Sequence, residues 1–169
     1  VSSQYRERNS LSIKLMPLPL IWNPLKVTGT TPSPRCGHTI TAVEKNKVYV
    51  MFGGLDSEKK NGKVAPNNQV WVLRVGKESC DIRLQQCSGD IPLPRTNHAA
   101  CYVPPDKVVV FGGYYSTNQR FNDTYVLKTS NFSWSQPANQ KAGQEPKNTE
   151  SKIGAPAPRA NHSATYHNG

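Results

Sequence analysis

The chain repeats a five-residue motif three times, and this repetition constrains its fold more than any other feature. The motif reads proline, arginine, two variable residues and histidine, and its copies begin at Pro34, Pro94 and Pro158. A period of about sixty residues is long enough for one supersecondary unit with extended loops. The chain is therefore expected to consist of one structural unit used repeatedly.

Two apolar runs lie between the motifs, at 48–54 and 108–113, and each ends in a pair of glycines. Both runs are rich in β-branched and aromatic residues and are too short for helices, so they predict strands buried on both faces. Segments 68–73 and 122–127 follow in matching register. Each unit then carries a last strand, which contains Ile82 in one unit and Trp134 in the other.

This order of motif, apolar run, glycine pair and aromatic strand resembles the kelch repeat family over residues 18–169. The resemblance implies an all-β fold of kelch-type β-propeller blades, each with four antiparallel strands, as part of a larger propeller. About two complete and two partial repeats are expected within a single partial propeller that covers 1–169. The expected parts are the end of a preceding blade, two blades and the start of the next, at 18–34, 35–94, 95–158 and 159–169.

Several repeated residues are expected to build the blades rather than to bind a partner. Paired glycines suit a positive φ or a close approach of two backbones, aromatic residues suit the space between sheets, and arginines can form forked hydrogen bonds to carbonyls or carboxylates. Every blade needs such residues, whatever the protein binds. The residues assigned to this structural role are Arg35, His38, Gly53, Gly54, Trp71, Arg95, His98, Gly112, Gly113, Tyr125, Trp134, Arg159 and His162.

The sequence predicts no metal site, no cofactor and no catalytic residues. No cysteine pair has the spacing of a zinc site, and the motif histidines are expected to recur by repeat position without converging on one point. Cys36 and Cys101 are expected to be free buried thiols. Cys80 and Cys87 flank one strand and could pair only in an oxidising compartment.

The formal net charge is +10, and part of it falls in the loops that follow the glycine pairs. Lys59, Lys60 and Lys63 lie in the first such loop and Arg120 in the second. The favoured interpretation is that these charges keep a β-rich surface solvated. The alternative is that they attract a protein with an acidic surface. Nucleic acid is not an expected partner, because no long basic run with an aromatic platform is present.

No apolar run is long enough to cross a bilayer, and the first residues lack the apolar centre of a signal peptide. The expected protein has no membrane span and is intracellular, in the cytoplasm.

The resemblance implies that partners dock on the propeller face built by loops 55–67, 89–93, 114–121 and 138–157. Loops held by a rigid scaffold commonly carry recognition. Adjacent tyrosines beside an amide and a guanidinium have the composition of an interface hot spot, although one tyrosine could instead pack on the neighbouring blade. These residues are Tyr114, Tyr115, Asn118 and Arg120. Segment 138–157 is expected to be a mobile loop.

These observations favour a protein-interaction module, a scaffold or adaptor that binds another protein and has no chemistry of its own. The alternative is the regulatory or recognition kelch domain of a larger enzyme. Segment 32–38 fits the opening box of the repeats attached to kelch-containing Ser/Thr phosphatases, which makes such an enzyme the example.

Overall fold

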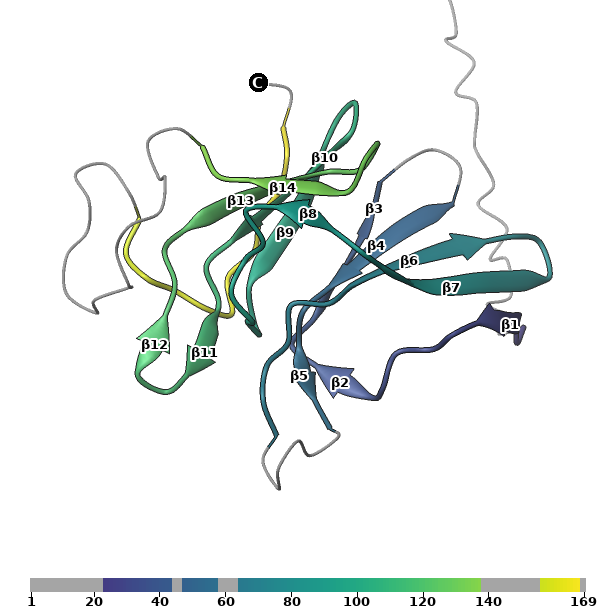
Figure 1. The fold of residues 1–169 in the computed structure, drawn as a ribbon, viewed down its shortest axis with the longest axis horizontal. Helices are drawn as coiled ribbons and strands as arrows, with labels where there is room; N and C mark the ends of the chain where they lie inside the picture. The colour runs from purple at the N-terminus through teal and green to yellow at the C-terminus, as the bar shows by residue number, and fades with distance from the viewer. Residues whose placement is uncertain (1–22, 44–46, 58–63, 138–155, 168–169) are drawn as a thin grey trace, which may run out of the picture.

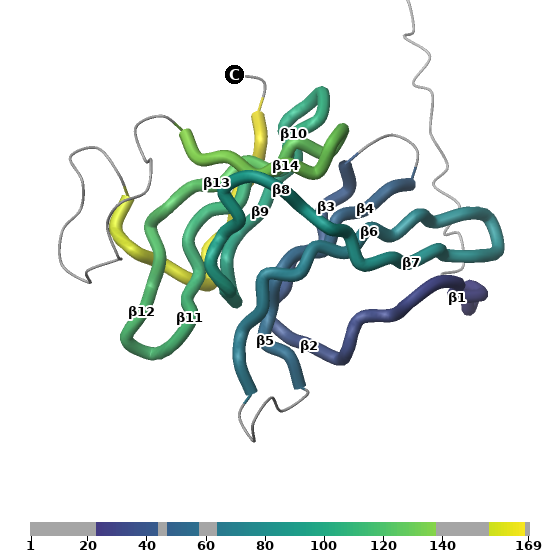
Figure 2. Tube along the Cα trace, viewed as in Figure 1, coloured from purple at the N-terminus to yellow at the C-terminus, as the bar shows by residue number. Residues whose placement is uncertain are grey.

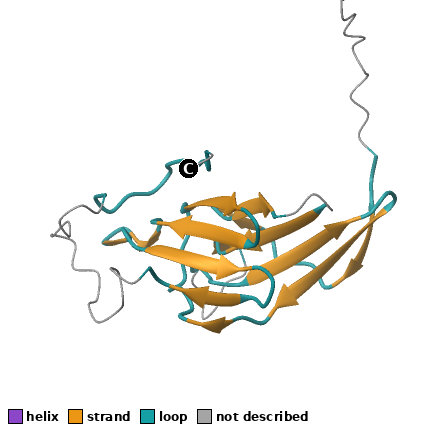
Figure 3. Cartoon of the chain, turned by 90° about the horizontal axis from the view of Figure 1, so that it is seen from above, coloured by secondary structure: helices purple, strands orange, loops and turns teal. Residues whose placement is uncertain are grey.

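The computed structural model describes residues 23–43, 47–57, 64–137 and 156–167. Within these ranges all regular secondary structure is β-strand (Figure 3). The described residues accordingly contain no helix with the length and apolarity needed to cross a membrane.

The first sheet has five strands in the order β1-β7-β6-β4-β3. Four of them pair antiparallel, and the fifth, β1, pairs parallel to β7. From the parallel edge inward the bounds are β1 Lys26–Gly29, β7 Ser79–Gln85, β6 Val70–Val75, β4 Val48–Phe52 and β3 Thr39–Ala42.

The second sheet repeats this arrangement in the order β8-β14-β13-β10-β9. Its four antiparallel strands lie beside those of the first sheet (Figure 1), and β8 pairs parallel to β14. The bounds are β8 Ser88–Gly89, β14 Ser133–Ser135, β13 Thr124–Lys128, β10 Lys107–Phe111 and β9 Ala99–Val103. The predicted all-β fold with four antiparallel strands per unit is therefore confirmed.

The parallel outer strand of each sheet was not predicted. Gly29 of β1 lies opposite Ile82, and Gly89 of β8 lies opposite Trp134. Both glycines have positive φ, and a Cβ on either would collide with the carbonyl oxygen of its partner. The linker that enters each unit therefore covers the outer edge of a blade, which would otherwise offer unpaired backbone groups.

Two short ladders extend from the ends of the sheets. One joins β2, Arg35–Cys36, to β5, Leu55–Asp56. The other is a hairpin of β11, Tyr114–Ser116, and β12, Gln119–Arg120. An isolated bridge between Thr96 and Tyr114 repeats the β2–β5 pairing in the second unit. Both ladders lie on the lower side of the molecule in Figure 2, and this side is called the loop face below.

The strand register shows how the two units correspond. Ile82 pairs with Leu73, and Trp134 pairs with the equivalent Leu127. Ile82 therefore occupies the position at which the second unit has tryptophan.

The main core lies between the two sheets. Val50 and Phe52 of the first sheet belong to one buried cluster with Val110, Leu127 and Trp134 of the second. The Phe52 and Trp134 rings have centroids 5.0 Å apart and are tilted at 52°, a separation at which aromatic pairs attract. Stacking of one sheet on the next thus buries the faces that neither sheet could cover alone.

The expectation that both apolar runs are buried on both faces is wrong for the second run. Val108 and Val110 are fully buried, whereas Val109 and Phe111 are only half-buried. Alternate residues of a strand point to opposite faces, and only one face of β10 packs on the first sheet. Phe111 on the other face contacts the ring of His162, at a centroid distance of 5.3 Å.

Candidate partner-binding face

The loop face is anchored by the buried arginine of the second motif. Arg95 is fully buried, and its two terminal nitrogens bind the two Asp123 carboxylate oxygens at 2.6 and 3.0 Å. The same guanidinium donates to the Gly112 carbonyl oxygen at 3.0 Å and lies 4.3 Å from the centroid of the Phe121 ring. A forked, charge-assisted pair of this kind fixes both position and orientation.

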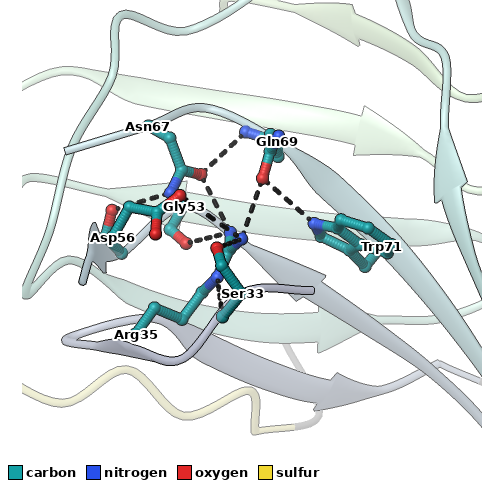
Figure 4. A network of polar contacts seen from close by, with 8 residues as sticks. Ser33, Arg35, Gly53, Asp56, Asn67, Gln69 and Trp71 are labelled. Carbon is teal, nitrogen blue, oxygen red and sulfur yellow. Dashed lines mark hydrogen bonds and ion pairs between the residues drawn. The ribbon is translucent and has the colours of Figure 1, made fainter. Parts of the chain in front are cut away.

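The first motif builds a similar network with different partners (Figure 4). Arg35 donates to Asn67 Oδ1 at 3.2 Å and to Gln69 Oε1 at 2.9 Å. Gln69 stands where the second unit has Asp123, so the fork of carboxylate oxygens is missing here. A negative charge is instead supplied from β5, where Asp56 Oδ2 lies 3.9 Å from the guanidinium.

The third motif is only partly enclosed by the described residues. Arg159 donates through Nε to the Ala157 carbonyl oxygen at 3.0 Å, and its side chain is exposed. Its backbone is nevertheless fixed, because its N–H donates to the Phe121 oxygen and its carbonyl accepts from Gly113. The backbones of the second and third motifs thus pair with the glycine pair of the unit before them.

The glycine pairs are the points where that close approach occurs. Gly53 has φ 65° and Gly112 has φ 66°. A Cβ at Gly53 would lie 2.7 Å from the Arg95 carbonyl oxygen, and one at Gly112 would lie 2.7 Å from that of Arg159. Glycine is therefore required at both positions by conformation and by space.

Burial lowers the pKa of all three motif histidines. The His98 pKa is lowered to about 3, first by burial, then by the Arg95 charge, and further by His162 and His38. Burial is also the main cause that lowers the pKa of His38 and of His162. In the described ranges, no group of three histidine, cysteine or acidic side chains is arranged to hold a metal ion. The His98 ring contacts the Phe52 ring at a centroid distance of 5.0 Å, and its Nε2 forms a hydrogen bond with Thr39 Oγ1 at 2.9 Å.

The remaining predicted scaffold aromatics and glycines also lie inside the blades. Trp71 is buried, and its indole N–H donates to Gln69 at 3.2 Å. Tyr125 packs edge-on against Trp134. A Cβ at Gly54 would lie 2.9 Å from the Cβ of His38, and one at Gly113 would lie 2.9 Å from the Cβ of His98, the motif histidine of the same unit in each case.

The two tyrosines that were predicted as a binding pair are adjacent on β11 but differ in their environment. Tyr114 is half-buried, and its backbone exchanges two hydrogen bonds with Thr96, at 2.9 and 3.0 Å. Tyr115 is 44% exposed and lies on the loop face. Asn118 and Arg120 are exposed on the same hairpin, and Arg120 pairs across it with Tyr114.

Three further apolar residues on the loop face were missed by the sequence analysis. Val64, Ile91 and Leu93 are 44%, 48% and 49% exposed. Ile91 and Leu93 could have been found by aligning the two linkers, because the equivalent residues before the first motif are Thr31 and Ser33. Lys59, Lys60, Lys63 and segment 138–155 lie outside the described residues.

The structure differs from two expectations about the cysteines, namely the burial of Cys36 and Cys101 and the pairing of Cys80 with Cys87. All four are free, but Cys36 is exposed and Cys101 is only half-buried. Cys80 and Cys87 cannot pair with each other in this fold. They are separated by most of an extended strand, at about 3.3 Å per residue, whereas a disulfide needs Cα atoms within about 7 Å.

The repeat geometry agrees with a comparison against known families. The family model described as "KLHDC2/KLHL20/DRC7 Kelch-repeats domain" matches residues 58–169. The chain belongs to the kelch-repeat family. The motifs of the sequence and the two stacked sheets of the structure are thus both features of the kelch repeat.

Individual kelch relatives are much longer than this chain. Dynein regulatory complex subunit 7 of Chlamydomonas reinhardtii is 33% identical over 67% of this chain, which covers 9% of that protein. The tRNA wybutosine-synthesizing protein 2/3/4 of Oryza sativa is 37% identical over 75% of this chain, which covers 11% of that protein. A solved structure titled "Structure of YjhT" is 16% identical with a TM-score of 0.49, over 67% of this chain and 39% of that chain.

Proposed function

We propose that this kelch chain is a protein-binding module, a scaffold or adaptor without chemistry of its own, and that its partner docks on the loop face. The observation that carries the proposal is the difference in environment between the two tyrosines of the β11–β12 hairpin. Tyr114 is held by Thr96, whereas Tyr115 projects from the surface at 44% exposure. An exposed tyrosine next to a fixed backbone position is typical of an interface anchor.

The charge on this face favours a partner with an acidic surface. Arg120 is exposed beside the tyrosines and forms no ion pair with any described residue. The chain has a net charge of +10, so its field attracts anionic proteins over a distance of about 10 Å at 0.1 M salt. The basic residues at 59, 60 and 63 would add to this attraction.

A compartment inside the cell suits this proposal. The four free cysteines are compatible with a reducing environment such as the cytoplasm, where disulfides are rare.

A second candidate is that the chain is the recognition part of a larger enzyme, of which a kelch-containing Ser/Thr phosphatase is one example. This candidate is favoured by the relative from Oryza sativa, a protein named for tRNA wybutosine synthesis of which the chain covers only 11%. In both candidates the partner docks on the loop face. They differ only in whether the chain is joined to an enzyme.

A site-specific cross-linking experiment tests the proposal. A photoreactive phenylalanine replaces Tyr115 in the full-length protein, and a matched variant carries it at Arg83, whose side chain is 70% exposed on strand β7. We expect one dominant cross-linked protein from Tyr115 and none of it from Arg83.

Binding to that partner is then measured with purified proteins. The double variant Tyr115→Ala, Arg120→Ser should bind at least tenfold more weakly with an unchanged melting temperature, while Arg83→Ser binds normally. Equal cross-linking from both positions, or unchanged affinity of the double variant, would contradict docking on the loop face.

A further inference from the structure

Polar side chains surround the motif arginine of the first unit on the loop face. The Arg35 side chain is only 3% exposed, and a buried guanidinium needs partners that replace its lost water. Ser33 Oγ and Asp56 Oδ2 lie 3.0 and 3.9 Å from one of its nitrogens, Nη2. Asn67 Oδ1 accepts from Nη1 at 3.2 Å. The side chains at these three positions therefore converge on one guanidinium.

Backbone hydrogen bonds identify two of these positions in the second unit. The carbonyl oxygens of Ser33 and Leu93 each accept from Nε of the arginine two residues later, at 3.1 Å. The N–H groups of Asn67 and Phe121 each donate to the carbonyl oxygen of the second glycine in the pair of their own unit. Leu93 and Phe121 therefore replace a serine and an asparagine.

Strand pairing identifies the third position. Leu55 of β5 pairs with the residue that follows the first motif arginine, and Tyr114 of β11 pairs with the residue that follows the second. Asp56 and Tyr115 come directly after these two residues, so they occupy equivalent positions. The second unit thus has an apolar or aromatic residue at each of the three positions that are polar in the first.

This exchange is possible because the second arginine takes its counter-charge from another strand. Both carboxylate oxygens of Asp123 bind Arg95, at 2.6 and 3.0 Å. The buried Phe121 ring covers the guanidinium at 4.3 Å. The arginine therefore needs no polar side chain at the positions of Leu93 and Tyr115.

The leucine and the tyrosine are displayed on the same part of the loop face. In the first unit the side chains at their two positions contact one nitrogen atom, and the backbone contacts of those positions recur in the second unit. Leu93 and Tyr115 are 49% and 44% exposed, and the backbone is fixed at or beside each of them, by Arg95 and by the bridge to Thr96. A surface that is ordered before binding avoids the cost of ordering a loop. The name arginine rim is used below for Leu93 and Tyr115.

A positive charge lies on the same hairpin as the tyrosine of the arginine rim. Arg120 is exposed and forms no ion pair with any described residue. A guanidinium binds carboxylates through charge-assisted hydrogen bonds, whereas a basic residue would be repelled. The charge of the hairpin therefore favours an acidic residue beside whatever covers the rim.

We propose that the arginine rim binds an apolar side chain of the partner protein, next to an acidic residue that pairs with Arg120. This inference rests on the proposed function and deepens it, because it adds the apolar group to the acidic surface expected of the partner. It also assigns Leu93 as a residue that determines which partner binds.

The test uses three capped pentapeptides with serine at both ends. The first carries tryptophan between two aspartates, the second tryptophan between two lysines, and the third serine between two aspartates. Methyl NMR spectra of the full-length protein are recorded during titration with each peptide. We expect the first peptide to shift the Leu93 methyl signals and the other two to leave them unchanged. Absence of a shift with the first peptide, or an equal shift with either of the others, would overturn the proposal.

Matched variants locate the binding and guard against misfolding. Leu93→Ser installs the residue that the first unit has at this position, so the melting temperature should be retained while affinity for the first peptide falls at least fivefold. Leu84→Ser removes a leucine that is 43% exposed on β7 and should change nothing. Unchanged affinity in Leu93→Ser would refute the rim even if Tyr115 cross-links a partner. Loss of peptide binding in Leu93→Ser without any cross-linked partner would support the rim and contradict only the proposed function.

Discussion

The Arg95 guanidinium and the Asp123 carboxylate form a two-point contact, with N···O distances of 2.6 and 3.0 Å, at the entrance to the second unit. The arginine is fully buried, and the aspartate retains 25% side-chain exposure. The pair therefore joins the motif to the start of β13 and positions the loop face between them.

Replacing Asp123 with alanine should destabilise the fold by about 3 kcal/mol, because it leaves a buried charge without its partner. Asp123→Gln installs the carboxamide that the first unit has at Gln69, which accepts from Arg35 at 2.9 Å, so its cost should be smaller. Urea unfolding at pH 7 measures both. Equal losses for the two variants would show that a carboxamide acceptor restores none of the stability that the carboxylate provides.

Replacing Gly53 with valine should lower stability by several kcal/mol. The residue has φ 65°, and a Cβ would lie 2.7 Å from the Arg95 carbonyl oxygen, so conformational strain and a backbone clash add together. Gly76→Ala is the control, because Gly76 has no left-handed φ and its Cβ would approach Ser79 no closer than 3.2 Å. A melting temperature for Gly53→Val equal to that of the control would disprove the close approach.

Stability should fall as the pH is lowered from about 6.5 toward 3. The pKa of His98 is lowered from 6.5 to about 3, mainly by burial, so the unfolded chain binds a proton in this window while the folded chain does not. One such group can lower stability by at most about 1.4 kcal/mol per pH unit. His38 and His162 shift in the same direction.

The check is urea unfolding at pH 7.5, 6 and 5 for the native chain and for His98→Gln, which removes the most strongly shifted group. We expect the variant to be less stable at pH 7.5 but to lose less stability on acidification. A pH dependence as steep as that of the native chain would contradict the assignment of the effect to His98.

The repeated motif and strand pattern were sufficient to predict the all-β kelch fold, because they record requirements that every unit shares. The parallel strands β1 and β8 could not be predicted in the same way. β8 has only two residues, Ser88 and Gly89, and shows no alternation of apolar and polar side chains. Its position depends on the partner backbone around Trp134, which lies far along the sequence.

The site was predicted only in part, and for a physical reason. The composition of the β11–β12 hairpin was visible in the sequence. Only the structure shows that the Tyr114 backbone forms a bridge with Thr96 and that the Tyr115 side chain is exposed. Ile91 was overlooked because an isolated aliphatic residue in a linker has no periodicity. The burial of His98 against Phe52 depends on how successive sheets stack, which repeat spacing alone does not specify.

Hydrogen–deuterium exchange of the full-length protein, with and without the partner identified from Tyr115, tests the central claim most directly. The account predicts slower exchange on the loop face, in segments 55–57, 64–67, 89–93 and 114–121. It predicts no change in the turns at the opposite ends of the strands, at 76–78, 104–106 and 129–132. Protection confined to those turns would contradict the claim that partners bind this kelch chain through its loop face.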